Sequence, residues 1–184
     1  FKDGSYLLIQ LKTLAVLLFA FMTGQKSFGE ELYKNEFNHI TKETGLAGST
    51  ANKIVSDSYG RMWIATNAGV SIFNGILTSM VSFEGEDGKQ PFVFDICECP
   101  SEKTVYAATT DHIYVFSNER FSFVPFIKDM KQSHILCDNK RLYITNRKGF
   151  YVHENGKTIH EDVKGDPNVH CMALNPRGII LYGC

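Results

Sequence analysis

The side chains of this chain that are best suited to catalysis or metal binding are six histidines and five cysteines. The histidines show no His-Glu-x-x-His spacing, which would place two imidazoles and a general base on one face of a helix. No Gly-x-Ser-x-Gly turn is present to expose a nucleophilic serine. One close pair, Cys97 and Cys99, lacks the second pair that a structural zinc site needs. We therefore predict no catalytic residue, no metal ligand and no cofactor in this segment.

The cysteines are Cys97, Cys99, Cys137, Cys171 and Cys184. Side chains two residues apart in a strand share one face, so Cys97 and Cys99 lie side by side if this segment is extended. A disulfide between such close neighbours would be badly strained. We expect these residues to be buried apolar thiols.

Short polar residues follow several predicted strands. Asp57, Asp138 and Asn175 stand where such a side chain can hydrogen-bond its own turn, and we expect them to form turns and not to bind a ligand. Asp111-His112 and His153 lie at predicted turns or outer strands, where we expect structural roles.

A ligand-binding role remains possible for three aromatic residues. Tyr59, Tyr114 and Tyr151 could recognise a carbohydrate if they are exposed, although aromatic residues in strands more often belong to the core. Residues 85–88, Gly-Glu-Asp-Gly, would repel a phosphate and are interpreted as a solvated linker. The ligand-binding residues are not identified by the sequence.

The composition favours strands as the elements that position these side chains. The chain has 184 residues, 43% hydrophobic and 21% charged, with 19 basic and 20 acidic side chains. These values exclude a disordered or collagen-like chain, and without an excess of basic charge we expect no nucleic-acid partner. The 14 Phe and 8 Tyr against only 5 Pro favour an all-β fold with tight turns.

The first 29 residues resemble an export signal in layout. An apolar run at residues 13–24 follows Lys2 and Lys12 and precedes the small-residue triplet Ser27-Phe28-Gly29. The run is shorter than the roughly 20 apolar residues of a membrane-spanning helix. We predict a hydrophobic helix at residues 1–29 that is a signal peptide cleaved after Gly29 or an uncleaved membrane anchor, with the rest of the chain exported.

An internal repeat occupies the remainder. The segment Arg-Met-Trp-Ile-Ala-Thr-Asn-Ala-Gly-Val-Ser-Ile-Phe-Asn-Gly at residues 61–75 returns in degraded form twice and then begins once more. Its anchor residues are Trp63, Tyr106, Tyr143 and Ile180, at offsets of 43, 37 and 37 residues. A period near 40 made only of short strands is typical of a β-propeller, whose blades are four-stranded antiparallel sheets.

Each repeat predicts two apolar inner strands. The innermost strands are expected at residues 51–56, 92–98, 134–137 and 169–174, and the second strands at 62–66, 105–109, 142–145 and 179–183. Most lack alternation of polar and apolar residues, which indicates burial on both faces between neighbouring blades. The outer strand at residues 120–126 alternates and contains Pro125, so we expect a half-exposed edge.

The turn residues follow the repeat. Gly69 and Gly149 occupy one hairpin, and Asn74-Gly75 and Asn155-Gly156 the next, where glycine permits a positive φ. The second copy has Thr110-Asp111-His112 in place of the glycine, so we expect a different turn there.

These strands predict an incomplete β-propeller at residues 30–184, with about three and a half blades. The blades are expected at residues 51–83, 92–127 and 134–161, with a partial blade at 169–184. Residues 36–41 are interpreted as the outermost strand of the closing blade, whose partner would lie beyond Cys184.

Residues 37–75 resemble the two-component regulator propeller repeat. The resemblance is carried by Gly45-Leu46, Asp57, Gly60, Trp63-Ile-Ala-Thr66, Gly69-Val70 and Phe73-Asn-Gly75. In that family a Gly-Leu turn and a hydrophobic strand ending in Asp precede Trp-Ile-Gly-Thr, Gly-Leu and Phe-Asp-Gly. Ala65 replaces a glycine here, and the later copies have lost the tryptophan, so their membership rests on spacing.

The resemblance implies the extracytoplasmic, ligand-sensing propeller of a hybrid histidine-kinase type of two-component protein. Such a protein is anchored in the inner membrane with its sensor in the periplasm, and its kinase and phosphorelay domains are separate from the propeller. Its ligand would be a small molecule, with glycan fragments as one class known in the family, and would shift a homodimer between two states.

Two alternatives stay open. The same propeller could serve another output, such as a cyclic-dinucleotide synthase or a transcription factor. It could also belong to a secreted propeller enzyme or an adhesion scaffold. For the segment itself we expect no enzymatic activity.

Overall fold

A computed structural model describes residues 39–85, 88–124, 133–161, 171–175 and 178–183. The chain divides into two compact units, Phe1–His39 and Ile40–Cys184, and the fold described below is that of the second. The signal segment or anchor predicted at residues 1–29 lies outside the described residues. Within the ranges given above, no helix is both long and apolar enough to cross a membrane.

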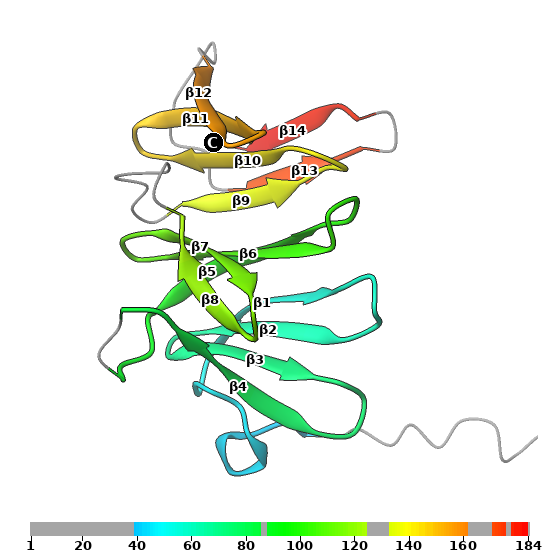
Figure 1. Cartoon of the computed structure of the whole chain (residues 1–184), viewed down its shortest axis with the longest axis vertical. Coiled ribbons are helices and arrows are strands. Elements are labelled where there is room, and N and C mark those ends of the chain that lie inside the picture. The colour runs from blue at the N-terminus through cyan, green and yellow to red at the C-terminus, as the bar shows by residue number, and fades with distance from the viewer. Residues whose placement is uncertain (1–38, 86–87, 125–132, 162–170, 176–177, 184) are drawn as a thin grey trace, which may run out of the picture. The chain divides into compact units, whose positions relative to one another are not determined.

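The second unit is all-β (Figure 1), as the composition predicts. A short 3-10 turn, η1 (Lys42–Thr44), precedes the strands. The strands are β1 (Ala51–Ser56), β2 (Met62–Thr66), β3 (Gly69–Phe73), β4 (Thr78–Phe83), β5 (Val93–Cys99), β6 (Thr104–Thr109), β7 (Ile113–Ser117), β8 (Arg120–Phe123), β9 (His134–Cys137), β10 (Leu142–Asn146), β11 (Gly149–Glu154), β12 (Lys157–Glu161), β13 (Cys171–Leu174) and β14 (Ile180–Gly183).

The strands follow the repeat found in the sequence. Strands β1–β4, β5–β8 and β9–β12 each form a four-stranded antiparallel meander, and β13 pairs with β14. We call these repeats 1 to 4. The predicted inner strands agree with the observed ones to within two residues at either end. The outer strand expected at residues 120–126 is shorter, since β8 ends at Phe123, and residues 125–132 lie outside the described ranges. The number of blades in a complete ring remains a prediction.

The outer strands of repeats 1 and 2 are paired with each other. Strand β4 runs parallel to β8, with Ser82 opposite Arg120 and Phe83 opposite Phe121. Residues 120–126 were expected to form a half-exposed edge. Strand β8 is half-exposed as expected, but its position at an edge is wrong, because β4 pairs with it. Repeats 1 and 2 thus form one eight-stranded sheet. Its two end strands, β1 and β5, contact each other, so that this sheet is barrel-like and nearly closed.

The innermost strands of successive repeats lie side by side. Strand β5 contacts β1 and β9, and β9 contacts β13. The Asn52 side-chain amide donates to the Val93 carbonyl at 2.7 Å, and the backbone N–H of Ile135 donates to the Asp95 carboxylate at 3.1 Å. Each of these bonds joins residues about 40 positions apart, which is the period of the repeat. The repeats are therefore arranged as successive blades of a propeller-type fold.

Two apolar clusters fill the interfaces between repeats. The first, between repeats 1 and 2, surrounds the fully buried Trp63, whose ring meets Phe116 at 4.8 Å and Phe121 at 5.9 Å between centroids. The second joins repeats 2 and 3 and includes Ile113 and Ile144. These edge-to-face aromatic contacts and the buried aliphatic side chains are the main apolar contribution to the stability of the fold.

Among the innermost strands, β1 is less buried than expected. Most residues of β5 are buried, because repeats 1 and 3 pack against it from either side. In contrast, β1 is almost entirely exposed, and Ile54 keeps 57% of its surface accessible. The prediction that residues 51–56 are buried on both faces is wrong for the described fold, because among the innermost strands β1 contacts β5 on one side only.

The closing strand expected before β1 stays a prediction, since its partner strand would lie beyond Cys184. Residues 36–41 were expected to form the closing strand, yet residues 39–41 form no strand, and residues 36–38 lie outside the described part. The backbone N–H of Thr41 instead donates to Thr44 Oγ1 at 2.7 Å, at the start of η1. This local bond favours a turn over an extended strand.

The predicted turns are confirmed. Gly69, Gly75, Gly149 and Gly156 all have positive φ angles, from 73° to 143°. In repeat 2 the turn at residues 110–112 has no positive φ and is held by Thr109, whose hydroxyl bonds the backbone of His112.

Candidate functional site

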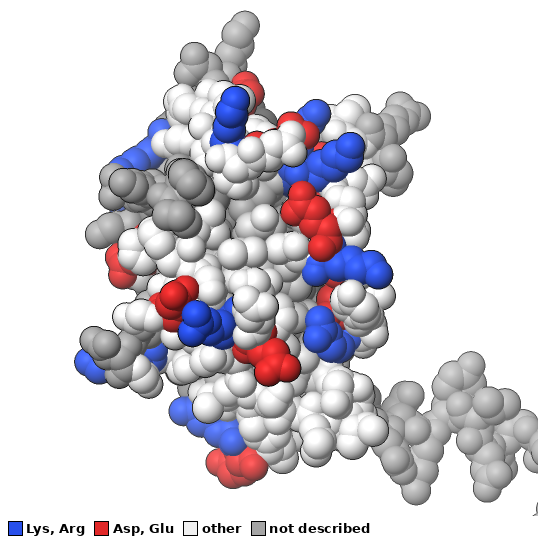
Figure 2. Space-filling model, in the orientation of Figure 1, with Lys and Arg blue, Asp and Glu red and all other residues white. Residues whose placement is uncertain are grey.

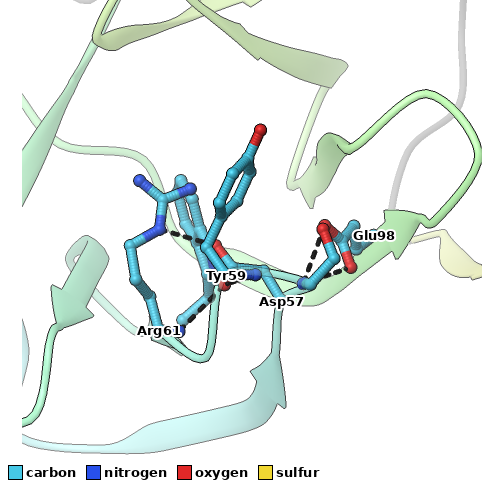
Figure 3. Close-up of polar contacts among 6 residues, drawn as sticks. Asp57, Tyr59, Arg61 and Glu98 are labelled. Carbon is cyan, nitrogen blue, oxygen red and sulfur yellow. Dashed lines mark hydrogen bonds and ion pairs between the residues drawn. The ribbon is translucent and has the colours of Figure 1, made fainter.

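The turn between the first two strands of repeat 1 is built around Asp57. One carboxylate oxygen accepts hydrogen bonds from the backbone N–H groups of Tyr59 at 3.0 Å and Arg61 at 2.9 Å. The other accepts from Nε1 of Trp63 at 2.8 Å and from Nε of Arg61 at 2.7 Å (Figure 3). Because this side chain is completely buried, its two oxygens fix the turn to the aromatic core of the fold.

The charge of Asp57 is stabilised by these donors. Burial alone would raise the pKa of this carboxyl, but the hydrogen bonds from Trp63 and from the backbone and side chain of Arg61 outweigh burial. The pKa of Asp57 therefore lies below its ordinary value, and the side chain is a carboxylate at neutral pH.

Repeats 3 and 4 also place a short polar side chain at the start of the turn between their first two strands. Asp138 accepts from the backbone N–H groups of Lys140 and Arg141, each at 2.7 Å, and Asn175 accepts from the N–H of Ile179 at 2.9 Å. The prediction that Asp57, Asp138 and Asn175 form turns is confirmed.

A second bond at Asp138 was not predicted. Its other oxygen accepts from the Tyr143 hydroxyl at 2.7 Å, just as Asp57 accepts from the Trp63 indole. The sequence did contain a signal for this contact. An arginine stands two residues before each aromatic donor, Arg61 before Trp63 and Arg141 before Tyr143, and the aspartate shortly precedes that arginine.

Tyr59 projects from the Asp57 turn into solvent. Its surface is 62% exposed, and two cations lie over its ring: the guanidinium carbon of Arg61 at 5.2 Å and Nζ of Lys103 at 4.9 Å from the centroid. Beside it, the Glu98 carboxylate of β5 accepts from the backbone N–H of Ser58 at 2.8 and 3.0 Å and from its hydroxyl at 2.8 Å (Figure 3). We call Tyr59, Arg61, Glu98 and Lys103 the Tyr59 rim.

The other two candidate tyrosines lie elsewhere. Tyr114 is 3% exposed and packs in the core with its ring 5.0 Å from that of Phe83. Tyr151 is half-buried, and its ring lies 4.9 Å from that of His160. Of the three, only Tyr59 presents its ring to solvent.

A cleft lies between the turns of repeats 3 and 4. It has a volume of about 530 Å³, and its polar lining includes Asp138, Arg141, Glu154 and Asn175. Nε of Arg141 forms an ion pair with Glu154 at 3.4 Å. Figure 2 shows acidic and basic side chains next to one another on the face in view. The cleft therefore offers hydrogen-bond donors and acceptors together, which suits a polar, uncharged ligand.

The histidines expected to be structural contact other residues of the fold. The His112 ring meets Phe123 edge-on at 4.7 Å, and Nδ1 of His153 lies 2.8 Å from the Thr158 hydroxyl. Burial lowers the pKa of His153. Among the described residues, no group of three or more His, Cys, Asp or Glu side chains is placed to hold a metal ion.

The cysteines differ in burial. Cys97 and Cys99 are buried, as predicted, and Cys137 is half-buried. Cys171 is exposed, which contradicts the expectation, because it begins β13, where every second residue faces outward. Cys184 lies outside the described residues.

Antiparallel four-stranded repeats with neighbouring innermost strands define a propeller-type all-β protein. Within that class, residues 45–68 match the family model described as "Two component regulator propeller". The chain therefore carries a repeat of this family, and the match contains β1, the Asp57 turn and Trp63. These are the residues on which the resemblance in the sequence rests.

Two solved structures are similar in fold, both from B. thetaiotaomicron. One is the extracellular domain of the "putative one component system BT4673", with a TM-score of 0.66 and 17% identity over 82% of this chain and 21% of that one. The other is the extracellular domain of the "putative hybrid two component system BT4673", with a TM-score of 0.63 and 16% identity over 80% and 20%. The chain thus spans about a fifth of the length of these structures. No curated protein matches it.

Proposed function

We propose that this chain is part of the extracytoplasmic, ligand-sensing propeller of a two-component signalling protein. The observation that carries the proposal is the family match at residues 45–68, which coincides with the Asp57 turn and its bond to Trp63. Two further facts support it: the fold resembles extracellular domains of B. thetaiotaomicron signalling systems, and the repeats pack through their innermost strands as propeller blades do.

The proposal extends to the whole protein. The sensor would be held at the inner membrane, and a ligand would change the arrangement of a homodimer whose cytoplasmic domains carry histidine-kinase and phosphorelay activity. Signalling of this kind requires that the ligand bind one arrangement more tightly than the other. The kinase would be encoded outside this segment.

The ligand we propose is a small oligosaccharide that contacts the Tyr59 rim. An exposed aromatic ring supplies an apolar face for the C–H side of a sugar ring, and neighbouring charged groups supply partners for its hydroxyls. The main chain of Tyr59 is held by the bond from its N–H to Asp57, while Glu98 is held by Ser58. The backbone that carries the ring and the carboxylate beside it are therefore in place before a ligand binds, which limits the ordering that binding requires.

The test uses the full exported protein. Screening it against an array of oligosaccharides, followed by calorimetry, should identify a binding sugar. We expect Tyr59→Ala to weaken that binding about tenfold, the equivalent of about 1.4 kcal/mol, whereas Tyr59→Phe, which keeps the ring, should bind nearly as well. Unchanged affinity in Tyr59→Ala would exclude the rim as the contact surface.

Location is tested separately. Alkaline phosphatase, which is active only outside the cytoplasm, is fused after residue 184 of the natural chain. An inactive fusion that is nevertheless produced in full would overturn the extracytoplasmic placement.

A further inference from the structure

Three thiols meet at the interface between repeats 2 and 3. Cys97 and Cys99 lie on β5 with 8% and 2% of their surfaces exposed, and Cys137 is the last residue of β9. The Sγ atoms of Cys97 and Cys137 are 2.8 Å apart. A disulfide bond is about 2.05 Å long, so a shift of about 0.8 Å would bring these two sulfur atoms to bonding distance.

The alignment of the two strands selects Cys97 over Cys99 as the partner of Cys137. The N–H of Ile135 bonds to Asp95, so position 95 lies opposite position 135, and two residues further along each strand Cys97 lies opposite Cys137. Cys99 also contacts the Cys137 thiol, but it lies two residues beyond that pairing, where β9 has already ended. A bond between Cys97 and Cys99 would be strained.

We propose that Cys97 and Cys137 form a disulfide that joins repeats 2 and 3. The proposal rests on the extracytoplasmic location proposed above, where disulfides persist.

The oxidant is a disulfide-containing molecule, either a small disulfide or a protein disulfide oxidase. The half-buried Cys137 thiolate attacks this disulfide, forms a mixed disulfide and releases one thiol. The Cys97 thiolate then attacks the sulfur of Cys137, and the second thiol of the oxidant leaves. Two protein thiols lose two electrons and two protons, and one disulfide becomes two thiols.

Burial sets the rate of this exchange in the folded chain. Desolvation raises the pKa of Cys97 and of Cys137, so that few molecules carry a thiolate at neutral pH. We expect slow oxidation near pH 7 and faster oxidation as the pH rises. Formation during folding, before the thiols are buried, avoids this barrier.

The cross-link would act on an interface that is otherwise held by weaker contacts. Next to the thiols, Asp95 accepts from Ile135 and lies 3.5 Å from Nδ1 of His134. A bond between positions 97 and 137 closes a loop of about one repeat and restricts the separation of the two repeats in the unfolded chain as well as in the folded one.

The experiment is a thiol map of the full chain. The purified protein is treated with oxidised glutathione at about pH 8.5, and the remaining thiols are alkylated without reduction. Trypsin leaves Cys97 and Cys99 in one peptide, but cleavage at Glu98 by a glutamyl endopeptidase separates them. The expected product is a Cys97–Cys137 linked pair with Cys99 alkylated.

Matched variants complete the test. Cys99→Ser should keep the cross-link, while Cys97→Ser and Cys137→Ser should lose it. The oxidised wild type and Cys99→Ser should melt about 5–10 °C above their reduced forms, whereas Cys97→Ser should not change. A Cys99–Cys137 link, or three alkylated thiols after prolonged oxidation, would overturn the proposal. If a variant fails to fold, the peptide map of the wild type decides alone.

The result is separable from the proposed function. Glutathione oxidation uses purified protein and does not depend on where the cell places it. A Cys97–Cys137 link formed in the tube, together with an inactive phosphatase fusion, would leave the geometry correct and the extracytoplasmic location wrong.

Discussion

Repeats 1 and 3 both turn from their first to their second strand around an aspartate, but the two turns differ in length, in aromatic partner and in burial. In repeat 1 the turn runs from Asp57 to Arg61 and its carboxylate bonds the indole of the fully buried Trp63. In repeat 3 it runs from Asp138 to Arg141, one residue shorter, and the half-buried carboxylate bonds the Tyr143 hydroxyl. The bond between a turn carboxylate and a second-strand aromatic donor is therefore retained although the residues around it have changed.

The shared feature is chemical. An indole N–H and a phenol O–H are both donors at the end of a large ring, and each needs an acceptor when it is buried. The two turns differ in the extent to which water can take the place of that acceptor. At Asp57 water has no access to the side chain, whereas at Asp138 solvent can reach part of it, so the two bonds should contribute unequally to stability.

The largest expected effect comes from removing the two carboxylates separately. Asp57→Ala leaves the Trp63 indole, the Arg61 guanidinium and two backbone N–H groups without their acceptor, and should lower the free energy of unfolding by about 2–4 kcal/mol. Asp138→Ala should cost about 1–2 kcal/mol, because water can partly replace the lost acceptor. Urea denaturation of the full chain measures both values.

Asp57→Asn is the matched control for this pair, since it keeps the side-chain volume and removes only the charge and one acceptor. We expect its cost to lie between those of Asp57→Ala and the wild type. Equal losses of unfolding free energy in Asp57→Ala and Asp138→Ala would contradict the conclusion that the two turns contribute unequally to stability.

A smaller effect is expected from the residue that lengthens the turn of repeat 1. Gly60 has a φ of 78°, and Gly178 occupies the same place in repeat 4 with a φ of 75°, whereas the shorter turn of repeat 3 needs no such residue. A Cβ at Gly60 would meet nothing within 4 Å, so the cost of Gly60→Ala is one of backbone conformation alone, about 1 kcal/mol.

Gly60→Asn is the informative companion, because asparagine tolerates positive φ better than alanine does. Its loss of stability in urea should be smaller than that of Gly60→Ala. If the two variants lose the same amount, the backbone explanation is wrong.

The smallest expected effect is a loss of stability at acidic pH. The hydrogen bonds outweigh burial at both turns, so the pKa values of Asp57 and Asp138 lie below their ordinary value of 3.8. A carboxyl with a lowered folded pKa contributes its stabilisation in full above the unfolded value and loses it as the pH falls through the folded one. Stability should therefore decline as the pH falls below about 4, and the decline should be shallower in Asp57→Asn. Urea midpoints between about pH 6 and pH 3 measure it, and parallel curves for the two proteins would count against the role of Asp57.

The sequence predicted local structure well because that structure has local causes. The glycines at positions 69, 75, 149 and 156 fix hairpins, and the 40-residue period aligns the strands between them, so the bounds of the inner strands agree to within two residues. Asp57 and Asp138 were expected to bond their own turns, which are close in sequence.

Contacts between repeats were harder to predict. The parallel pairing of β4 with β8 depends on how two meanders are placed and not on the composition of either strand. The apolar pattern of β1 indicates that Ile54 is suited to burial, but it does not indicate whether a neighbouring strand covers this residue, which is exposed in the fold. Two contacts nevertheless left a signal: Cys97 and Cys137 are separated by one repeat, and so are Asp95 and Ile135.

The candidate site was predicted in part. Tyr59 was among the tyrosines considered, but its exposure could not be separated from the burial of Tyr114, since both are aromatic residues in or next to strands. The cations over its ring come from two different repeats, and only the packing of β5 beside β1 brings Lys103 to Tyr59.

The pairing of β4 with β8 also bears on how the chain comes apart. A further bond from the N–H of Glu84 to the carbonyl of Phe121 at 2.8 Å, and an ion pair of Glu84 with Arg120 at 3.7 Å, extend this pairing beyond the strand ends. Neither meander can separate without breaking its hydrogen bonds to the other. The first two repeats should therefore open together as a single cooperative unit in hydrogen exchange. The third repeat has its own sheet and should open independently.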